Sequence, residues 1–269
     1  MITQAEIQRI ANSQGVNTPQ IEKDYLLSWI LAGIARNELL SKLLVFKGGT
    51  VLKKFYFPDY RYSEDLDFTM LDKEKTNEEI KDALEAVFEY VKKEANIPLS
   101  ISDFNEHQTG TINFHINYAG PLGGTGKSVK VDISKNELLK FEIENKQMFN
   151  SYSDLESCKP CILQCYSLPE VMTEKMRSLL QRQQPRDYYD LWYVCEYGGI
   201  EMADYGQEFE EKARHKKIKP EDLEKRVNRL EPVFKQQWKT SMLHQMNDLT
   251  PFETVSRELN RHLRKMFKG

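Results

Sequence analysis

The stretch VFKGGTVLKKFYFPDYRYSEDLDF, residues 45–68, combines a short apolar run, a pair of glycines and a cluster of acids. The apolar run has the length of a strand, and Gly48 and Gly49 separate it from a helical pattern. Three acids then concentrate negative charge just before an apolar residue: Glu64, Asp65 and Asp67. Such crowding destabilises a fold unless a cation offsets it, so we expect a cation site at this point of the chain.

The spacing of Asp65 and Asp67 suits a metal site. Residues two apart in a strand point to the same side, so both carboxylates project together while Leu66 and Phe68 face the other way. Hard oxygen ligands favour Mg²⁺, with Mn²⁺ as an alternative, and substrate phosphates normally complete its coordination. Glycines ahead of a helix let backbone N–H groups approach a phosphate closely. The pattern therefore predicts a nucleotide substrate.

A third acid follows in the apolar-flanked segment SVKVDIS, residues 128–134. Alternation places Val131 and Ile133 toward the core, and Asp132 on the other side, where it can join Asp65 and Asp67. Three carboxylates around two Mg²⁺ ions can activate an attacking hydroxyl and stabilise a leaving pyrophosphate.

Periodicity along the chain predicts an α/β fold whose N-terminal lobe, about 1–135, contains a mixed sheet, followed by a largely helical C-terminal lobe, 136–269. Helices are expected at 3–13, 18–36 and 76–95, after Gly48, and from Pro169 onward. Strands are expected at 43–46, 65–70, 98–104, 109–120 and 128–134, and CILQCYSL reads as a buried strand. We expect the nucleotide site between the two lobes.

Composition narrows the class of protein. With 29% charged residues and no apolar run of membrane-spanning length, the chain is expected to be soluble, with no membrane partner. The segment MITQAEIQRI lacks the features of a signal peptide, and four cysteines argue for a reducing cytoplasm. From Lys212 onward, 15 Lys and Arg face only seven Asp and Glu, although the whole chain has a net charge of −3.

The stretch 46–68 closely resembles the AbiEii/MenT family of abortive-infection and toxin–antitoxin nucleotidyltransferases, within the polymerase-β-like superfamily. The segment LPEVMTEKMRSLLQRQQPRDYYDLWYV, residues 168–194, resembles the later signature of that family. The resemblance implies that Lys175 and Asp190 complete the nucleotide site. It further implies a toxin that transfers NMP from an NTP to the tRNA 3′ acceptor end and is countered by a separately encoded antitoxin.

Physical reasoning gives the later residues similar roles. Lys175 is a compact cation on a predicted helix and can reach phosphate oxygens, although a surface lysine is the simpler interpretation. Asp187 and Asp190 are three apart on the next helix, so both could face the nucleotide, but Asp187 also suits a helix cap near Arg186 and Asp190 is the preferred candidate. Asp190 either holds Lys175 or contacts the nucleotide. Ser63 is a further candidate for contact with a phosphate. Three arginines have lower rank as candidates: Arg61, Arg182 and Arg186.

Several alternatives remain open at this level. Asp132 with Glu144 and Lys146 forms the D…E-x-K pattern of Mg²⁺-dependent nucleases, and the acceptor hydroxyl could belong to a protein rather than to RNA. A non-catalytic module with the same fold is a third possibility. A zinc site is suggested by a C-x2-C-x3-C pattern, but core thiols are the favoured interpretation because a fourth ligand is lacking: Cys158, Cys161 and Cys165.

The basic C-terminal segment predicts a helix over 252–268. Its cations recur at spacings of three and four, which would align most of them in one stripe: Arg257, Arg261, Arg264, Lys265 and Lys268. This stripe either holds the backbone of an RNA acceptor or is a solvated helix face.

Overall fold

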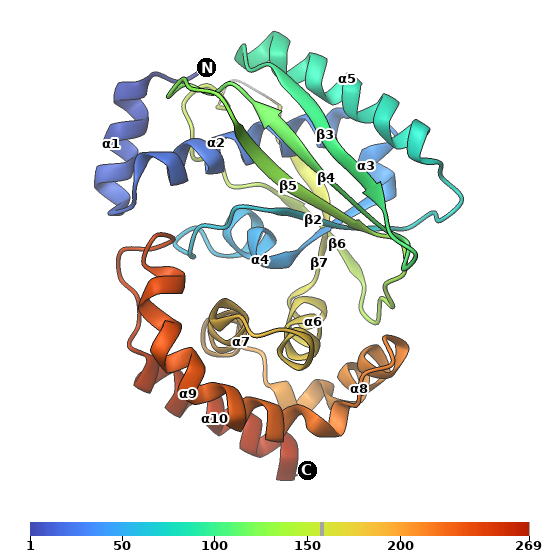
Figure 1. Ribbon diagram of the computed structural model, residues 1–269, viewed down its shortest axis with the longest axis vertical. Coiled ribbons are helices and arrows are strands. Elements are labelled where there is room, and N and C mark those ends of the chain that lie inside the picture. Colours follow the sequence, from blue (N-terminus) through green and yellow to red (C-terminus); the bar gives the residue numbers. More distant parts are fainter. Residues whose placement is uncertain (157–158, 269) are drawn as a thin grey trace. The chain divides into compact units, whose positions relative to one another are not determined.

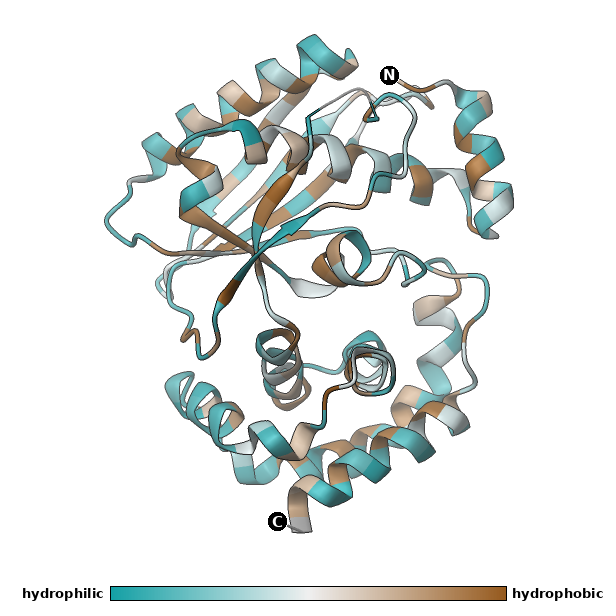
Figure 2. Cartoon of the chain, turned by 180° about the vertical axis from the view of Figure 1, so that it is seen from behind, coloured by the Kyte–Doolittle hydropathy of each residue, from teal (hydrophilic) through white to brown (hydrophobic). Residues whose placement is uncertain are grey.

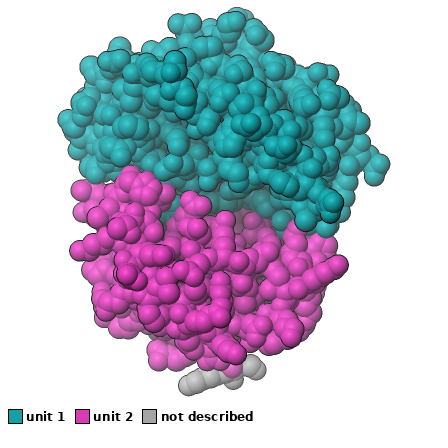
Figure 3. Space-filling model, viewed as in Figure 1, with its two compact units in different colours: residues 1–137, 143–165 teal, residues 138–142, 166–269 magenta. Residues whose placement is uncertain are grey.

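The computed structural model describes residues 1–156 and 159–268 of the 269-residue chain, and for residue 268 it describes the backbone only. They form two compact units, coloured separately in Figure 3. Unit 1 comprises Met1–Glu137 and Ile143–Cys165, and unit 2 comprises Leu138–Glu142 and Tyr166–Gly269. The boundary predicted from the sequence, after residue 135, lies close to the end of the first segment of unit 1 at Glu137. However, the prediction assigned residues 143–165 to the C-terminal lobe, whereas the structure includes these residues in unit 1.

A seven-stranded sheet has the order β3-β4-β5-β2-β1-β7-β6. Strand β2 runs antiparallel to β1 and parallel to β5, and β1 runs parallel to β7. The sheet is therefore mixed, as predicted. Its strands are β1 (Leu44–Lys47), β2 (Leu66–Met70), β3 (Leu99–Glu106), β4 (Thr111–Tyr118), β5 (Lys127–Ser134), β6 (Ile143–Gln147) and β7 (Ile162–Tyr166).

Four helices of unit 1 are α1 (Gln4–Gln14), α2 (Thr18–Arg36), α3 (Leu40–Leu43) and α5 (Asn77–Ala95). Side chains define where they start. Asn17 accepts the backbone N–H of Gln20 at the start of α2, and Thr76 with Glu79 forms the predicted capping box of α5. Helices α2 and α5 pack against each other beside the sheet (Figure 1), so their apolar faces enclose the core of this unit.

The segment after Gly48 is helical, as predicted, but its backbone hydrogen bonding changes from the α-helical to the π-helical pattern within two turns. Helix α4 (Gly48–Val51) continues into a π-helical turn, η1 (Leu52–Tyr56), in which the backbone N–H of Phe57 donates to the carbonyl of Leu52 at 2.8 Å. Such wide turns are rare and frequently mark functional sites. Here the turn accommodates a buried lysine, Lys54, that reaches across to α2.

Unit 2 is helical from Leu168 onward, in agreement with the predicted C-terminal lobe. Pro169 and Pro185 stand in the first turns of α6 and α7, where a missing N–H costs nothing. Apolar and polar residues alternate around α9 and α10 (Figure 2), as expected of helices that cover a core on one side. The helices are α6 (Leu168–Gln181), α7 (Pro185–Gly198), α8 (Gly206–His215), α9 (Leu223–Met242) and α10 (Phe252–Lys268), with 3-10 turns η2 (Met202–Tyr205) and η3 (Pro220–Asp222).

The cysteines support the core-thiol interpretation. Cys161 and Cys165 are free thiols buried in and beside β7, and burial raises the pKa of the Cys161 thiol to about 12. Cys158 lies outside the described residues. Within the described part of the chain, no helix is long and apolar enough to span a bilayer.

Candidate active site

Two of the predicted metal ligands lie side by side on neighbouring strands. Asp67 of β2 is directly opposite Asp132 of β5 in the parallel register. Residues paired across adjacent strands project to the same face, and Phe68, the next residue on β2, is 1% exposed on the opposite face. The alternation predicted from the sequence is therefore present in both strands.

The third acid lies within electrostatic reach of the other two. Asp65 directly precedes β2, and the hydroxyl of Thr50 donates to its carbonyl oxygen at 2.6 Å, which fixes the backbone at this point. Partial burial acts to lower the pKa of Lys130. However, its hydrogen bond to Asp132, at 2.5 Å, and the charges of Asp132, Asp65 and Asp67 together raise it above the usual value. All three carboxylates therefore act on one ammonium group.

The two glycines allow the backbone to lie against these side chains. Gly48 has φ +79°, and a Cβ atom there would lie 2.3 Å from Oδ2 of Asp67. A Cβ on Gly49 would lie 2.8 Å from Nη2 of Arg61 and 3.4 Å from Oγ of Ser63. Only glycine fits both positions without displacing a neighbour, because the first needs a left-handed backbone and both need the space.

Sequence reasoning missed a buried cation beside the acids. Lys47, the last residue of β1, lies opposite Asp67 in the antiparallel register and is 4% exposed. Its Nζ lies 3.5 Å from Oε1 of Glu137. The available signal was its position directly before the glycine pair. Glu64, counted among the crowded acids, instead forms an ion pair with Lys23 at 2.8 Å.

The donor set fits a hard divalent cation. Among the described residues, no three His, Cys, Asp or Glu side chains are gathered tightly enough to hold a metal ion as they stand. Nevertheless, Asp65, Asp67 and Asp132 contribute carboxylate oxygens, the ligand type that Mg²⁺ prefers, and the charges of all three act on the ammonium of Lys130.

In unit 2, Lys175 is held by two buried carboxylates. Its Nζ lies 2.6 Å from Oδ2 of Asp190 and 2.8 Å from Oδ1 of Asp187, and both aspartates are fully buried. The sequence left Asp187 as either a helix cap near Arg186 or a second carboxylate beside Asp190, and the structure makes it an ion-pair partner of both Lys175 and Arg182. Burial acts to raise the pKa of Asp187, yet these two cations hold it below the usual value.

Lys175 is 5% exposed, so it is not a solvated surface lysine. Arg182 donates two hydrogen bonds to Asp187, so its guanidinium group is held by a carboxylate of the same unit. The carboxylates of Asp65, Asp67 and Asp132 belong to unit 1, and Lys175 and Asp190 belong to unit 2. A single nucleotide site built from both groups stays a prediction.

The nuclease alternative requires Asp132, Glu144 and Lys146 to share a metal ion. Asp132 is on β5 and the other two are on β6, four positions away in the sheet order, or about 19 Å at ordinary strand spacing. Glu144 accepts a hydrogen bond from the hydroxyl of Tyr56 at 3.1 Å, and the ammonium of Lys146 lies over the same ring. These residues therefore cannot form one nuclease site.

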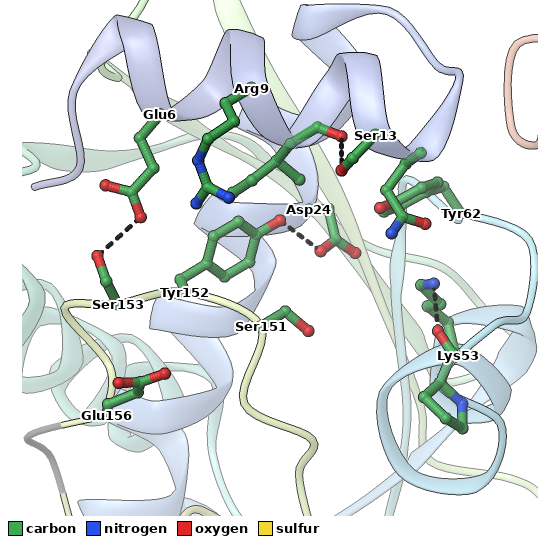
Figure 4. A pocket seen from close by; sticks show the side chains of 13 residues that line it. Glu6, Arg9, Ser13, Asp24, Lys53, Tyr62, Ser151, Tyr152, Ser153 and Glu156 are labelled. Carbon is green, nitrogen blue, oxygen red and sulfur yellow. Dashed lines mark hydrogen bonds between the residues drawn. The ribbon is translucent and has the colours of Figure 1, made fainter.

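A buried ion pair lies close to the segment that carries the acids. Oδ2 of Asp24 accepts hydrogen bonds from Lys54 and from the hydroxyl of Tyr152, each at 2.6 Å. Figure 4 shows the hydrogen bond from Tyr152 to Asp24 in the wall of a cavity of about 350 Å³, which Tyr62 also lines. Ser63, the next residue, is buried near Gly49. The ion pair thus joins α2 to the π-helical turn that follows the glycine pair.

Replacing Asp24 with alanine is expected to lower the free energy of unfolding by about 3 to 5 kcal/mol, because it leaves Lys54 buried without its counter-charge. Urea denaturation measures this change. The matched control is Lys23→Ala in the neighbouring position, which breaks a partly exposed pair and should cost at most about 1 kcal/mol. Equal losses in the two variants would contradict the structural role of the buried pair.

A family model described as nucleotidyl transferase AbiEii toxin, type IV TA system, matches residues 29–258. The match includes both motifs, the acids of unit 1 and the lysine cluster of unit 2. The chain belongs to this family. As an AbiEii-family protein it is a nucleotidyltransferase toxin of a toxin–antitoxin system, and the family predicted from the two motifs is confirmed.

Solved structures share the fold of this AbiEii-family enzyme. MenT4, a nucleotidyltransferase toxin from Mycobacterium tuberculosis, is 15% identical with a TM-score of 0.71, over 99% of this chain and 90% of that one. JHP933 from Helicobacter pylori is 16% identical with a TM-score of 0.56, over 94% of each chain. A putative nucleotidyltransferase from H. pylori is 17% identical with a TM-score of 0.58, over 94% of this chain and 96% of that one. No curated protein matches the sequence.

Proposed function

We propose that this AbiEii-family enzyme uses Mg²⁺ to transfer NMP from an NTP to the 3′-terminal hydroxyl of tRNA. The observation that carries the proposal is the register of Asp67 against Asp132, with Asp65 acting on the same ammonium and Gly48 lying against the Asp67 carboxylate. This arrangement combines a cation site with a backbone that can approach phosphates closely.

In this proposal Asp65 and Asp67 hold the divalent ion, Mg²⁺ or Mn²⁺, and Asp132 either joins them or accepts the proton of the attacking hydroxyl. When bound, the ion neutralises phosphate oxygens and favours the ionised acceptor hydroxyl. The acceptor oxygen attacks the α-phosphorus in line, the bond to the bridging oxygen breaks, and pyrophosphate leaves. Gly48 and Gly49, with Ser63, orient the phosphates.

Lys175 is assigned to a phosphate oxygen of the nucleotide. An ammonium group has three donors, and Asp187 and Asp190 account for two of them. The carboxylates fix the direction of the remaining donor, so its positive charge is pre-organised for the phosphate. Asp190 therefore acts by positioning Lys175.

The family places the enzyme in a toxin–antitoxin system, so an antitoxin and an NTP are its expected partners. We further propose that it acts in the cytoplasm, where tRNA is the acceptor. A protein hydroxyl is the competing acceptor, and a single experiment separates the two.

The enzyme is incubated with each α-labelled NTP, Mg²⁺ and total cellular RNA or protein. We expect one NTP to be preferred and its label to enter RNA of tRNA size, with transfer lost in EDTA. As a control, periodate oxidation of the RNA removes the terminal hydroxyl and should prevent labelling. Label that enters protein, or RNA that accepts label after oxidation, would contradict the proposed acceptor.

A further inference from the structure

The predicted basic stripe on α10 is largely neutralised by acids. Arg257 pairs with Glu258 at 3.0 Å, which lies on the same helix. Two further cations of the stripe pair with acids near the end of α7: Arg261 with Glu196 and Lys265 with Glu201, each at 2.5 Å. Arg264 donates to the backbone carbonyl of Asn260 at 3.1 Å, and Lys268 has no described side chain. The paired cations therefore behave as a charge-balanced helix face, and the stripe is a poor candidate for an RNA surface.

A different basic surface lies around a cavity of about 260 Å³ within unit 2. It is lined by residues from the end of α6, from the loop before η3 and from the start of α9: Leu180, Ile218, Lys219, Asp222, Lys225, Arg226 and Arg229. Four of the seven side chains are cationic and only one is acidic. Because like charges so close together repel one another, this cavity attracts anions.

Helical geometry concentrates the cations on this side of α9. Asp222, Lys225 and Arg229 follow spacings of three and four, so they share one face, whereas the acids Glu221 and Glu224 do not line the cavity. Within residues 1–156 and 159–268, no ion pair joins Lys219, Lys225 or Arg229 to a carboxylate. These three positive charges therefore differ from those on α10.

One wall of the cavity is the end of α6, the helix that carries Lys175. Arg226 donates from Nε to the carbonyl of Leu179 at 3.4 Å, which ties α9 to the end of α6. Lys175 lies on the same helix, five residues before Leu180, which corresponds to about 7 Å along the helix axis. A chain bound in the cavity therefore lies against the helix that also carries the residue assigned to the nucleotide.

We propose that this cavity binds the phosphate backbone of the RNA acceptor, with Lys219, Lys225 and Arg229 as the contacting cations. The inference rests on the proposed function, because it takes RNA to be the acceptor. Its position near Lys175 favours the substrate over an acidic protein partner, which the test treats as a separate outcome.

The test compares the triple variant Lys219→Gln, Lys225→Gln, Arg229→Gln with the control triple variant Arg257→Gln, Arg261→Gln, Lys265→Gln. Both remove three positive charges, but only the control removes paired ones. Fluorescence anisotropy without NTP measures the affinity for an acceptor-stem hairpin with a single-stranded 3′ end, between about 50 and 200 mM salt. A melting curve checks that each variant is folded.

The cavity variant should bind RNA about tenfold or more weakly. The slope of log K against log salt should become shallower by about two, because the variant has lost three phosphate contacts and binding therefore releases fewer counterions. The control should retain most of the wild-type slope. A wild-type slope in the cavity variant would overturn the inference, as would weakened binding of poly-glutamate with RNA binding unchanged. If wild-type enzyme labels no RNA, the proposed function fails, while this binding measurement still decides the role of the cavity.

Discussion

Replacing Asp67 with alanine is expected to reduce nucleotidyl transfer about a thousandfold or more, because it removes a carboxylate at the centre of the proposed cation site. Asp67 lies opposite Asp132, and a Cβ on Gly48 would meet its carboxylate, so its side chain lies between the second acid strand and the glycine pair. It faces away from the core, so the melting temperature should change little. Label transfer from the preferred α-labelled NTP measures the effect.

Glu144→Ala is the matched control for this experiment. It removes an acid from another strand of the same sheet, where the side chain contacts Tyr56 rather than the proposed site. Transfer should stay near the wild-type level. If Glu144→Ala abolishes transfer and Asp67→Ala does not, the assignment of the acids is wrong.

Replacing Lys175 with methionine should abolish use of the NTP and also destabilise the enzyme. The substitution leaves Asp187 and Asp190 buried near each other with one cation fewer, at a cost of about 3 to 5 kcal/mol in the free energy of unfolding. Loss of activity in this variant alone therefore cannot separate a nucleotide contact from a structural role. Urea denaturation and NTP binding are measured together.

The double variant Lys175→Met, Asp190→Asn separates the two roles. It restores the charge balance, since Asp187 retains Arg182 as a partner, so much of the lost stability should return. Transfer should stay abolished, because no ammonium reaches the phosphate. Activity that returns together with stability would show that Lys175 is structural and does not bind the nucleotide.

The parts of the fold and site that local patterns encode could be predicted from the sequence. Alternation placed Asp67 and Asp132 on the polar face of their strands, and the capping box at Thr76 fixed the start of α5. A spacing of two or of three to four residues carries this information within one segment. The family resemblance added Lys175 and Asp190, which the structure brings together.

The remainder depends on partners that are distant in the chain. Asp24 and Lys54 are thirty residues apart, and nothing at either position signals the other. The position of Lys47 opposite Asp67 follows from strand register, which pairing across the sheet decides. Asp187 was ranked below Asp190 for the same reason. A carboxylate in a first helical turn has the signature of a cap, and only the fold shows that a lysine twelve residues earlier points at it.

The chain passes between its two units three times, after Glu137, after Glu142 and after Cys165. Unit 1 therefore lacks β7, the parallel neighbour of β1, until residue 165 has been synthesised. Domains generally fold as units during synthesis, with the N-terminal one first. On the ribosome, the strand that ends at the glycine pair thus waits for more than a hundred further residues before its second neighbour exists. A nascent toxin of this kind cannot complete its acid-bearing sheet until well over half of the polypeptide has been made.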